Sequence, residues 1–173
     1  MYCSTTYHSP IGIITLACND GNLVGLWNEG QKYHGGSMPE TMTQNNNLPV
    51  FCAAKQWLDR YFAGEQPAIS ELPLAPIGSA FRQGVWDILC KIPYGKVVTY
   101  GDIAKQLGCK SSQAIGGAVG HNPISIIIPC HRVVGANGSL TGYAGGVEMK
   151  IKLLTLEGAD MSGLFVPKKG TAL

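Results

Sequence analysis

Apolar and polar positions in the first 80 residues predict a small sheet followed by a helix. The runs Ile11–Cys18 and Leu23–Trp27 favour β-structure, and Asn19–Asn22 between them is a turn signal, so we expect a β-hairpin. The polar stretch 31–47, rich in glycine and asparagine, predicts an exposed loop. A helix ending at Gly64 is expected next, because apolar side chains recur at helical spacing at Phe51, Ala54, Leu58, Tyr61 and Phe62.

A proline-rich stretch, Glu65–Gly78, is the candidate linker between two domains. It contains prolines at positions 67, 73 and 76. The charge balance changes sign at the same place. Residues 1–77 carry three Lys or Arg against six Asp or Glu, a net charge of −3, and residues 78–173 carry ten against five, a net charge of +5. We therefore expect an N-terminal domain over residues 1–75, built as a sheet plus a helix, and a C-terminal domain over residues 76–173.

The second half of the chain reads as mostly helical. Thr99 and Asp102 match a capping box, in which a hydroxyl and a carboxylate satisfy the first backbone N–H groups of a helix, and this helix should run to about Leu107. The preceding helix can be capped by Ser79, and its apolar face consists of Phe81, Val85, Ile88, Leu89 and Ile92.

A further short helix is expected directly after a tight turn at Gly108–Lys110. Ser111 or Ser112 can cap it, and it should run to about His121. Two short helices around a tight turn suggest a helix-turn-helix, which binds DNA, although two packed helices without any nucleic-acid role fit the same pattern. The basic C-terminal half favours a polyanionic partner, but an ordinary charged surface explains it equally well.

Composition excludes several classes of protein. Hydrophobic residues make up 45% of the chain and charged residues 14%, which is a folding composition rather than a disordered one. No apolar run reaches the length of about 18 residues that a membrane span needs. The start of the chain lacks the basic patch and apolar run of a signal peptide, so we expect a soluble cytoplasmic protein. The chain has six cysteines, and we expect five of them to be buried or idle thiols in a reducing cytosol. The six are Cys3, Cys18, Cys52, Cys90, Cys109 and Cys130.

The segment that carries candidate chemistry is 124–131. A β-branched apolar run, predicted to be a buried strand, leads into Pro129, Cys130 and His131. An unperturbed cysteine has a pKa of about 8.5, so little of it is the nucleophilic thiolate at neutral pH. A neighbouring histidine can accept its proton through a water molecule. A core cysteine beside a surface histidine is the alternative that adjacency alone leaves open.

The longer string around this pair resembles a known family. Asn122-Pro123, Pro129–Val133 and Gly142–Gly146 together resemble the alkylguanine-DNA alkyltransferases, also called methylated-DNA–protein-cysteine methyltransferases. The resemblance covers residues 81–158 closely, whereas the first 75 residues match only loosely at Ser9–Gly12. It implies a small α/β domain followed by a helical domain that contains a helix-turn-helix.

The resemblance also implies a reaction. Members of the family remove an alkyl group from the 6-oxygen of guanine in double-stranded DNA, and some also from the 4-oxygen of thymine. Cys130 would be the nucleophile and the permanent acceptor, so each molecule would act once and no cofactor would be needed. His131 would act as base towards Cys130 through water, and Glu157 would hold and polarise that histidine. Asn122 would brace the turn that presents the cysteine.

Further roles are carried over for recognition of the base and the DNA. Tyr100 would donate a hydrogen bond to the guanine ring, Tyr143 would line the base pocket, and the backbone at Val133 and Ala144 would contact the base edge. The helix-turn-helix would enter the minor groove while the damaged nucleotide is flipped out of the duplex. The other residues expected to bind the base or the DNA are Ser112, Gln113, Ala114 and Arg132.

Two departures from the family pattern change the picture. Gln113 stands where an arginine normally fills the gap left by the flipped base, and glutamine brings no charge and less stacking surface. We therefore expect weaker flipping and weaker DNA affinity than is usual in the family. Some members hold zinc in the N-terminal domain, but the spacing of Cys3, Cys18, His8 and His34 matches poorly, so no structural metal is expected.

Two other functions remain as alternatives. Alkyltransferase-like proteins bind alkylated DNA without repairing it, and they lack the acceptor cysteine. A thiol hydrolase of the Cys-His kind would need an oxyanion hole and an orienting Asn or Asp. The resemblance suggests a monomer. The range of alkyl groups accepted depends on the loop 135–146 and on the tail 160–173, which the sequence does not explain.

Overall fold

The computed structural model describes residues 1–36 and 38–167 of the chain, and contacts divide the molecule into two compact units. Unit 1 combines Met1–Ile77 with the short segment Pro123–Ile127, and unit 2 combines Gly78–Asn122 with the chain from Ile128 onward. The chain therefore leaves unit 2 for five residues and returns to it two residues before Cys130.

Unit 1 is built on a four-stranded sheet. Its strands are β1 (Tyr2–Ser9), β2 (Gly12–Asn19), β3 (Asn22–Asn28) and β4 (Thr43–Gln44), in the order β3-β2-β1-β4. The predicted hairpin is confirmed as β2 and β3, which pair antiparallel. Asp20 and Gly21 between them both have positive φ, as a two-residue hairpin turn of the primed type requires. Strand β1 was not predicted from the sequence, because its polar alternation lacks a strong apolar run.

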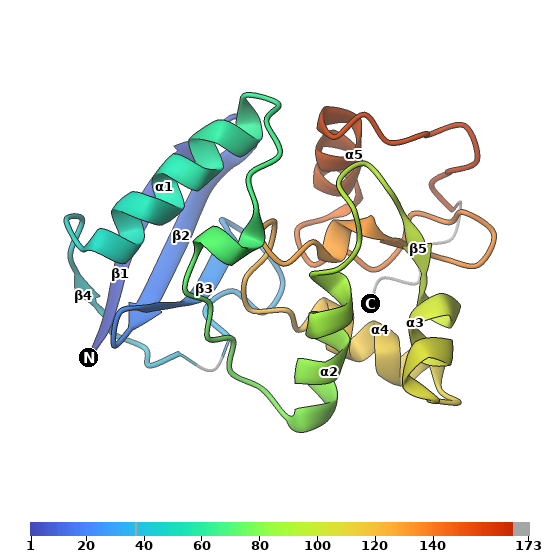
Figure 1. The fold of residues 1–173 in the computed structure, drawn as a ribbon, viewed down its shortest axis with the longest axis horizontal. Helices are drawn as coiled ribbons and strands as arrows, with labels where there is room; N and C mark the ends of the chain where they lie inside the picture. Colours follow the sequence, from blue (N-terminus) through green and yellow to red (C-terminus); the bar gives the residue numbers. More distant parts are fainter. Residues whose placement is uncertain (37, 168–173) are drawn as a thin grey trace. The chain divides into compact units, whose positions relative to one another are not determined.

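Helix α1 (Pro49–Phe62) packs on this sheet, as Figure 1 shows. The predicted apolar face is the buried one at Phe51, Ala54, Leu58 and Tyr61, whereas Phe62 is only partly buried.

The stretch Glu65–Gly78 is not a loose linker. Its backbone pairs with Leu23 on both sides, through Leu23 N–H to the Pro73 carbonyl at 2.8 Å and Ala75 N–H to the Leu23 carbonyl at 2.9 Å.

Unit 2 is mostly helical. Its regular elements are α2 (Ala80–Leu89), β5 (Val98–Thr99), α3 (Tyr100–Leu107), α4 (Ser112–Gly120), the 3-10 turn η2 (Cys130–Arg132), β6 (Val133–Val134) and α5 (Val147–Leu156). The capping box of Thr99 and Asp102 is confirmed at the start of α3. Ser111 rather than Ser112 caps α4, accepting a hydrogen bond from Ala114 N–H at 3.1 Å. Helices α3 and α4 pack together across the tight turn between them, and both contact α2 (Figure 1).

The predicted strand over 124–128 is wrong. The segment is buried, but it forms only an isolated parallel bridge between Leu26 and Ile124, followed by a turn. Ile126 has a φ of 71°, and Ile127 N–H donates to the Ser125 carbonyl at 2.8 Å, which is a γ-turn. A short apolar run predicts burial but not extended backbone, and the five residues 123–127 must enter and leave unit 1 within their own length.

No helix within residues 1–36 and 38–167 is long and apolar enough to cross a membrane.

Candidate active site

Two successive tight turns present Cys130. Pro129, with φ −82° and ψ 66°, is the centre of an inverse γ-turn in which Cys130 N–H donates to the Ile128 carbonyl at 2.8 Å. The same carbonyl accepts a hydrogen bond from Asn122 Nδ2 at 2.8 Å. Asn122 therefore braces the turn before the cysteine. Cys130 is 5% exposed and begins the 3-10 turn η2.

His131 and Glu157 form a buried pair. His131 Nε2 lies 2.6 Å from Glu157 Oε2, and neither side chain is exposed to solvent. Burial would raise the pKa of Glu157, but hydrogen bonds from His131 and Arg132 outweigh this and hold the pKa well below its usual value. Burial lowers the pKa of His131, against the opposing effect of Glu157. The pair is therefore a neutral imidazole that donates from Nε2 to an ionised carboxylate.

The other ring nitrogen of His131 has a different environment. Within the part of the chain that the structure describes, buried Nδ1 has no hydrogen-bond partner. Since Nε2 carries the hydrogen donated to Glu157, Nδ1 carries the lone pair and is the atom that can accept a proton. Glu157 thus sets the tautomer in which His131 can act as a base towards its neighbour in the chain, Cys130.

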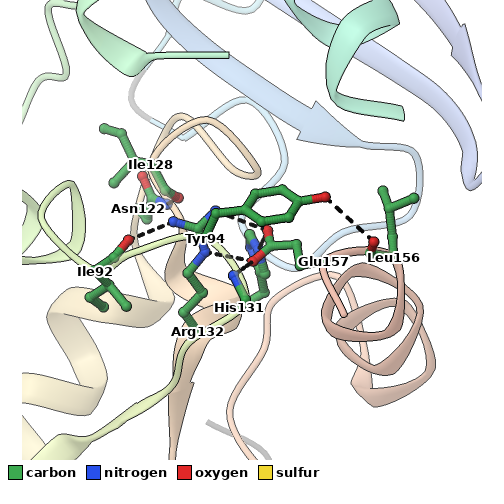
Figure 2. Close-up of polar contacts among 9 residues, drawn as sticks. Ile92, Tyr94, Asn122, Ile128, His131, Arg132, Leu156 and Glu157 are labelled. Carbon is green, nitrogen blue, oxygen red and sulfur yellow. Dashed lines mark hydrogen bonds and ion pairs between the residues drawn. The ribbon is translucent and has the colours of Figure 1, made fainter. Parts of the chain in front are cut away.

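Arg132, which the resemblance places among the residues that bind the base and the DNA, lies buried in this cluster. Its Nε donates to Glu157 Oε1 at 2.7 Å and its Nη2 to Glu157 Oε2 at 3.0 Å. Its remaining arm donates to the Ile92 carbonyl at 2.7 Å, and the side chain is buried. Figure 2 shows these bonds converging on the Glu157 carboxylate between His131 and Arg132. A fork-shaped cation that bonds both carboxylate oxygens fixes their orientation and compensates their charge.

The turn at Gly95 closes the cluster from another side. Gly95 N–H donates to Glu157 Oε1 at 3.0 Å. Gly95 has a φ of 74°, and a Cβ there would lie 2.8 Å from the Glu157 carbonyl oxygen, so a side chain would not fit. Its neighbour Tyr94 places its ring 5.7 Å from the Arg132 guanidinium and donates its hydroxyl to the Leu156 carbonyl at 3.4 Å (Figure 2).

The two tyrosines expected to contact the base differ in their hydroxyl partners. Tyr100, the first residue of α3, donates to the Thr141 carbonyl at 3.0 Å, so it could donate to a base only by giving up that bond. Among the described residues the buried hydroxyl of Tyr143 has no partner. Its ring lies 6.5 Å from that of His131, edge to face. Burial raises the pKa of both phenols, so both remain protonated donors at neutral pH.

Lys150 is a residue that the sequence reasoning missed. It is 1% exposed, and its ammonium donates to the carbonyls of Val133 and Thr141. Burial lowers its pKa to about 8, while the nearby Cys130 acts in the opposite direction. A signal was present, because Lys150 stands three and four positions before the buried Leu153 and Leu154 on the core face of α5. It ties the start of β6 to the loop that carries Tyr143.

The start of α4 has a different character. The side chains of Ser112, Gln113 and Ala114 are exposed. Further along the helix, a Cβ added at Gly117 would meet no described atom within 4 Å. Of the two positions expected to act through the backbone, Val133 is buried and Ala144 is half-buried. Across residues 1–36 and 38–167, no group of three His, Cys, Asp or Glu side chains could hold a metal ion.

Comparison with known proteins matches both halves of the chain. The ribonuclease-like domain of 6-O-methylguanine DNA methyltransferase matches residues 1–76, and the DNA binding domain of the same family matches residues 80–159. A methylated-DNA–protein-cysteine methyltransferase of Methanosarcina acetivorans is 45% identical over 155 residues, covering 88% of this chain and 96% of the relative. The corresponding protein of Haemophilus influenzae is 42% identical over 154 residues, covering 88% and 84%.

Comparison with solved structures leads to the same family. The crystal structure of Mycobacterium tuberculosis OGT in complex with DNA has a TM-score of 0.82 and 43% sequence identity, covering 90% of this chain and 93% of that chain. An O6-methylguanine DNA methyltransferase from Methanococcus jannaschii has a TM-score of 0.65 and 30% identity, covering 95% and 99%.

Proposed function

Because the chain belongs to the 6-O-methylguanine DNA methyltransferase family, we propose that it repairs alkylated DNA by transferring the alkyl group from the 6-oxygen of guanine onto Cys130. The observation that carries the assignment of Cys130 is its position in the chain. It follows a turn braced by Asn122 and precedes a neutral His131 that an ionised Glu157 holds in one tautomer.

The first step is loss of the thiol proton. The proton passes from Cys130 Sγ to His131 Nδ1 through a water molecule, and the imidazolium that forms is stabilised by the Glu157 carboxylate 2.6 Å from Nε2. The thiolate then attacks the alkyl carbon. A sulfur–carbon bond forms, the carbon–oxygen bond breaks, and its electron pair goes to the guanine 6-oxygen. The product at Cys130 is a thioether, which water does not hydrolyse readily, so each molecule reacts once.

The target atom lies inside the duplex, so the nucleotide has to be flipped out at a cost of a few kcal/mol. The exposed start of α4, with small side chains around Gln113, is the surface that we propose enters the DNA groove. The relative from Mycobacterium tuberculosis was solved in complex with DNA. The unpaired hydroxyl of Tyr143 is available to donate to the flipped base without breaking an internal bond.

A reducing cytoplasm would keep Cys130 competent for transfer, and we place the protein there as a monomer.

The test is the mass of the intact protein after incubation with a duplex that contains one O6-methylguanine. Wild-type protein should gain the mass of one CH2, because a methyl group replaces a hydrogen, and peptide mapping should locate the gain at Cys130. Cys130→Ala should gain nothing. Cys52→Ala removes an exposed thiol on α1 and should react like the wild type. A gain that persists in Cys130→Ala would contradict the assignment of the acceptor.

The same measurement separates the alternatives. A protein that only binds alkylated DNA would shift the mobility of the duplex while its own mass stayed constant. A Cys-His thiol hydrolase would turn over a thioester repeatedly in the absence of DNA. Repair of 4-methylthymine is tested by exchanging the lesion in the same duplex.

A further inference from the structure

The segment that leads to the acceptor cysteine is held by unit 1. Leu26 N–H on strand β3 donates to the Pro123 carbonyl at 2.8 Å, and Ser125 N–H donates to the Leu26 carbonyl at 3.1 Å. Residues 123–127 therefore extend the edge of β3, although the chain on both sides of them belongs to unit 2.

A buried side-chain network completes this attachment. Gln31, in the loop after β3, places Nε2 3.2 Å and Oε1 3.4 Å from Ser125 Oγ. Gln31 Oε1 is itself fixed by Asn28, accepting from its backbone N–H at 2.9 Å and from its Nδ2 at 3.3 Å. Ser125 and Asn28 are each 1% exposed and Gln31 is 7% exposed. Buried polar groups without partners are costly, so this network specifies one position for Ser125.

The residue that follows Ser125 in the chain has a strained backbone conformation. Ile126 is β-branched and buried, and its φ of 71° is a conformation that such residues rarely adopt. Strain of this kind persists only where the surroundings over-determine the backbone, and it is concentrated at functional sites. On the far side of Ile126, the Ile128 carbonyl is held by Asn122 Nδ2 and Cys130 N–H. Ser125 is thus the near anchor of the turn and Ile128 is the far one.

We propose that Gln31 and Ser125 are a positioning pair for alkyl transfer: their buried hydrogen bond holds the Ile126 turn and thereby sets the position of Cys130. The proposal rests on the function assigned above. Neither side chain touches the reacting atoms. Their effect reaches the sulfur through the short, buried path from Ser125 to Cys130, in which Pro129 limits the backbone further. A displacement of about 1 Å at a reacting group can cost about 100-fold in rate.

The test uses Ser125→Ala and Gln31→Met in the full chain, with single-turnover transfer followed at increasing concentrations of lesion duplex. The first-order rate constant at saturating DNA should fall about tenfold in each variant, within the range that misplacement of a reacting group allows. The Kd for DNA should stay within about twofold, because neither residue lies in the helical unit that carries α4. The double variant should transfer the alkyl group no more slowly than the slower single variant, because the two substitutions remove the same hydrogen bond.

Thr5→Val is the matched control. Thr5 in β1 is also 1% exposed and donates its hydroxyl to Asn46 Oδ1 at 2.7 Å, so the variant loses a partly buried side-chain hydrogen bond in the same unit away from residues 123–127. Its melting temperature should fall about as much as that of Ser125→Ala, with a transfer rate within twofold of the wild type. If Ser125→Ala does not fold, Gln31→Met decides alone, because methionine keeps the side-chain volume.

Two results would overturn the proposal: unchanged transfer in the folded variants, or equal slowing in Thr5→Val. Failure of the assigned function looks different, because the wild-type protein would then gain no mass at Cys130 at all.

Discussion

The Glu157 cluster and the start of helix α4 lie in the same helical unit and are built in opposite ways. Around Glu157, donors from His131, Arg132 and Gly95 all point at one buried carboxylate. At the start of α4, the side chains of Ser112, Gln113 and Ala114 are exposed.

The two regions suit different tasks. Activating a thiol needs groups whose charge and orientation are fixed before the substrate arrives. Entering a DNA groove, the role that we propose for the start of α4, needs side chains that are free to contact the duplex. Substitutions in the first region should therefore damage both stability and chemistry, whereas substitutions in the second should change affinity and leave the fold intact.

The largest effect is expected from Glu157→Gln. Glutamine keeps the shape but loses the charge, so His131 loses the carboxylate that stabilises its protonated form and Arg132 becomes a buried unpaired cation. Transfer at saturating DNA should slow by about 100-fold or more, the contribution typical of a general base. The free energy of unfolding, measured in urea, should fall by about 3–5 kcal/mol.

A double variant separates the two losses. Arg132→Met combined with Glu157→Gln removes both ends of the ion pair, and removing both is far less destabilising than leaving one charge buried alone. Stability should recover substantially while transfer stays slow. Recovery of transfer together with stability would mean that Glu157 serves the fold alone.

The next effect in size is a loss of stability in acid. The folded-state pKa values of His131 and Glu157 both lie below their ordinary values of 6.5 and 4.5, so the unfolded chain binds more protons on acidification. The stability that they contribute is complete above those ordinary values and is lost as the pH falls. Urea titrations should show the free energy of unfolding declining below pH 6.5 and more steeply below pH 4.5. The double variant should lack the part due to Glu157, and an identical decline in that variant would contradict this assignment.

The smallest effect is expected from Gln113→Arg at the exposed start of α4. The added charge should tighten duplex binding by about two- to tenfold at moderate salt and raise the slope of log Kd against log salt by about one. The melting temperature should not change, since Gln113 is exposed. Gln106→Arg on α3 adds the same charge to another exposed position and is the control. If Gln113→Arg leaves both affinity and transfer rate unchanged, Gln113 does not limit flipping.

Local signals in the sequence predicted local structure well. The hairpin turn at Asp20-Gly21 and the capping box at Thr99–Asp102 depend on residues within a few positions of each other, and both are confirmed. The string around Cys130 resembled the correct family, because the chemistry there depends on consecutive residues. The pairing of His131 with Glu157, 26 positions apart, came from that resemblance and not from the pattern of residues.

The sequence-based predictions failed where contacts between residues far apart in the chain determine the local structure. The run 124–128 has the composition of a strand, but its attachment to Leu26 and Gln31, almost a hundred positions earlier, imposes a turn instead. The ion pair of Arg132 with Glu157, 25 positions along the chain, was not predicted either. Lys150 was overlooked because a lysine is seldom buried, and the sequence does not show that the Val133 and Thr141 carbonyls, 17 and 9 positions before it, receive its ammonium.

The four side chains of Cys130, His131, Glu157 and Arg132 together keep the net charge of the site constant. When the thiol proton reaches His131 in the mechanism that we propose, the charges alternate: sulfur negative, imidazole positive, carboxylate negative, guanidinium positive. Their sum is zero before and after the proton moves, so ionising the sulfur brings no net charge into the interior and needs no counter-ion from solution. The chemical step should accordingly be indifferent to ionic strength, even while association with the polyanionic duplex depends on it strongly.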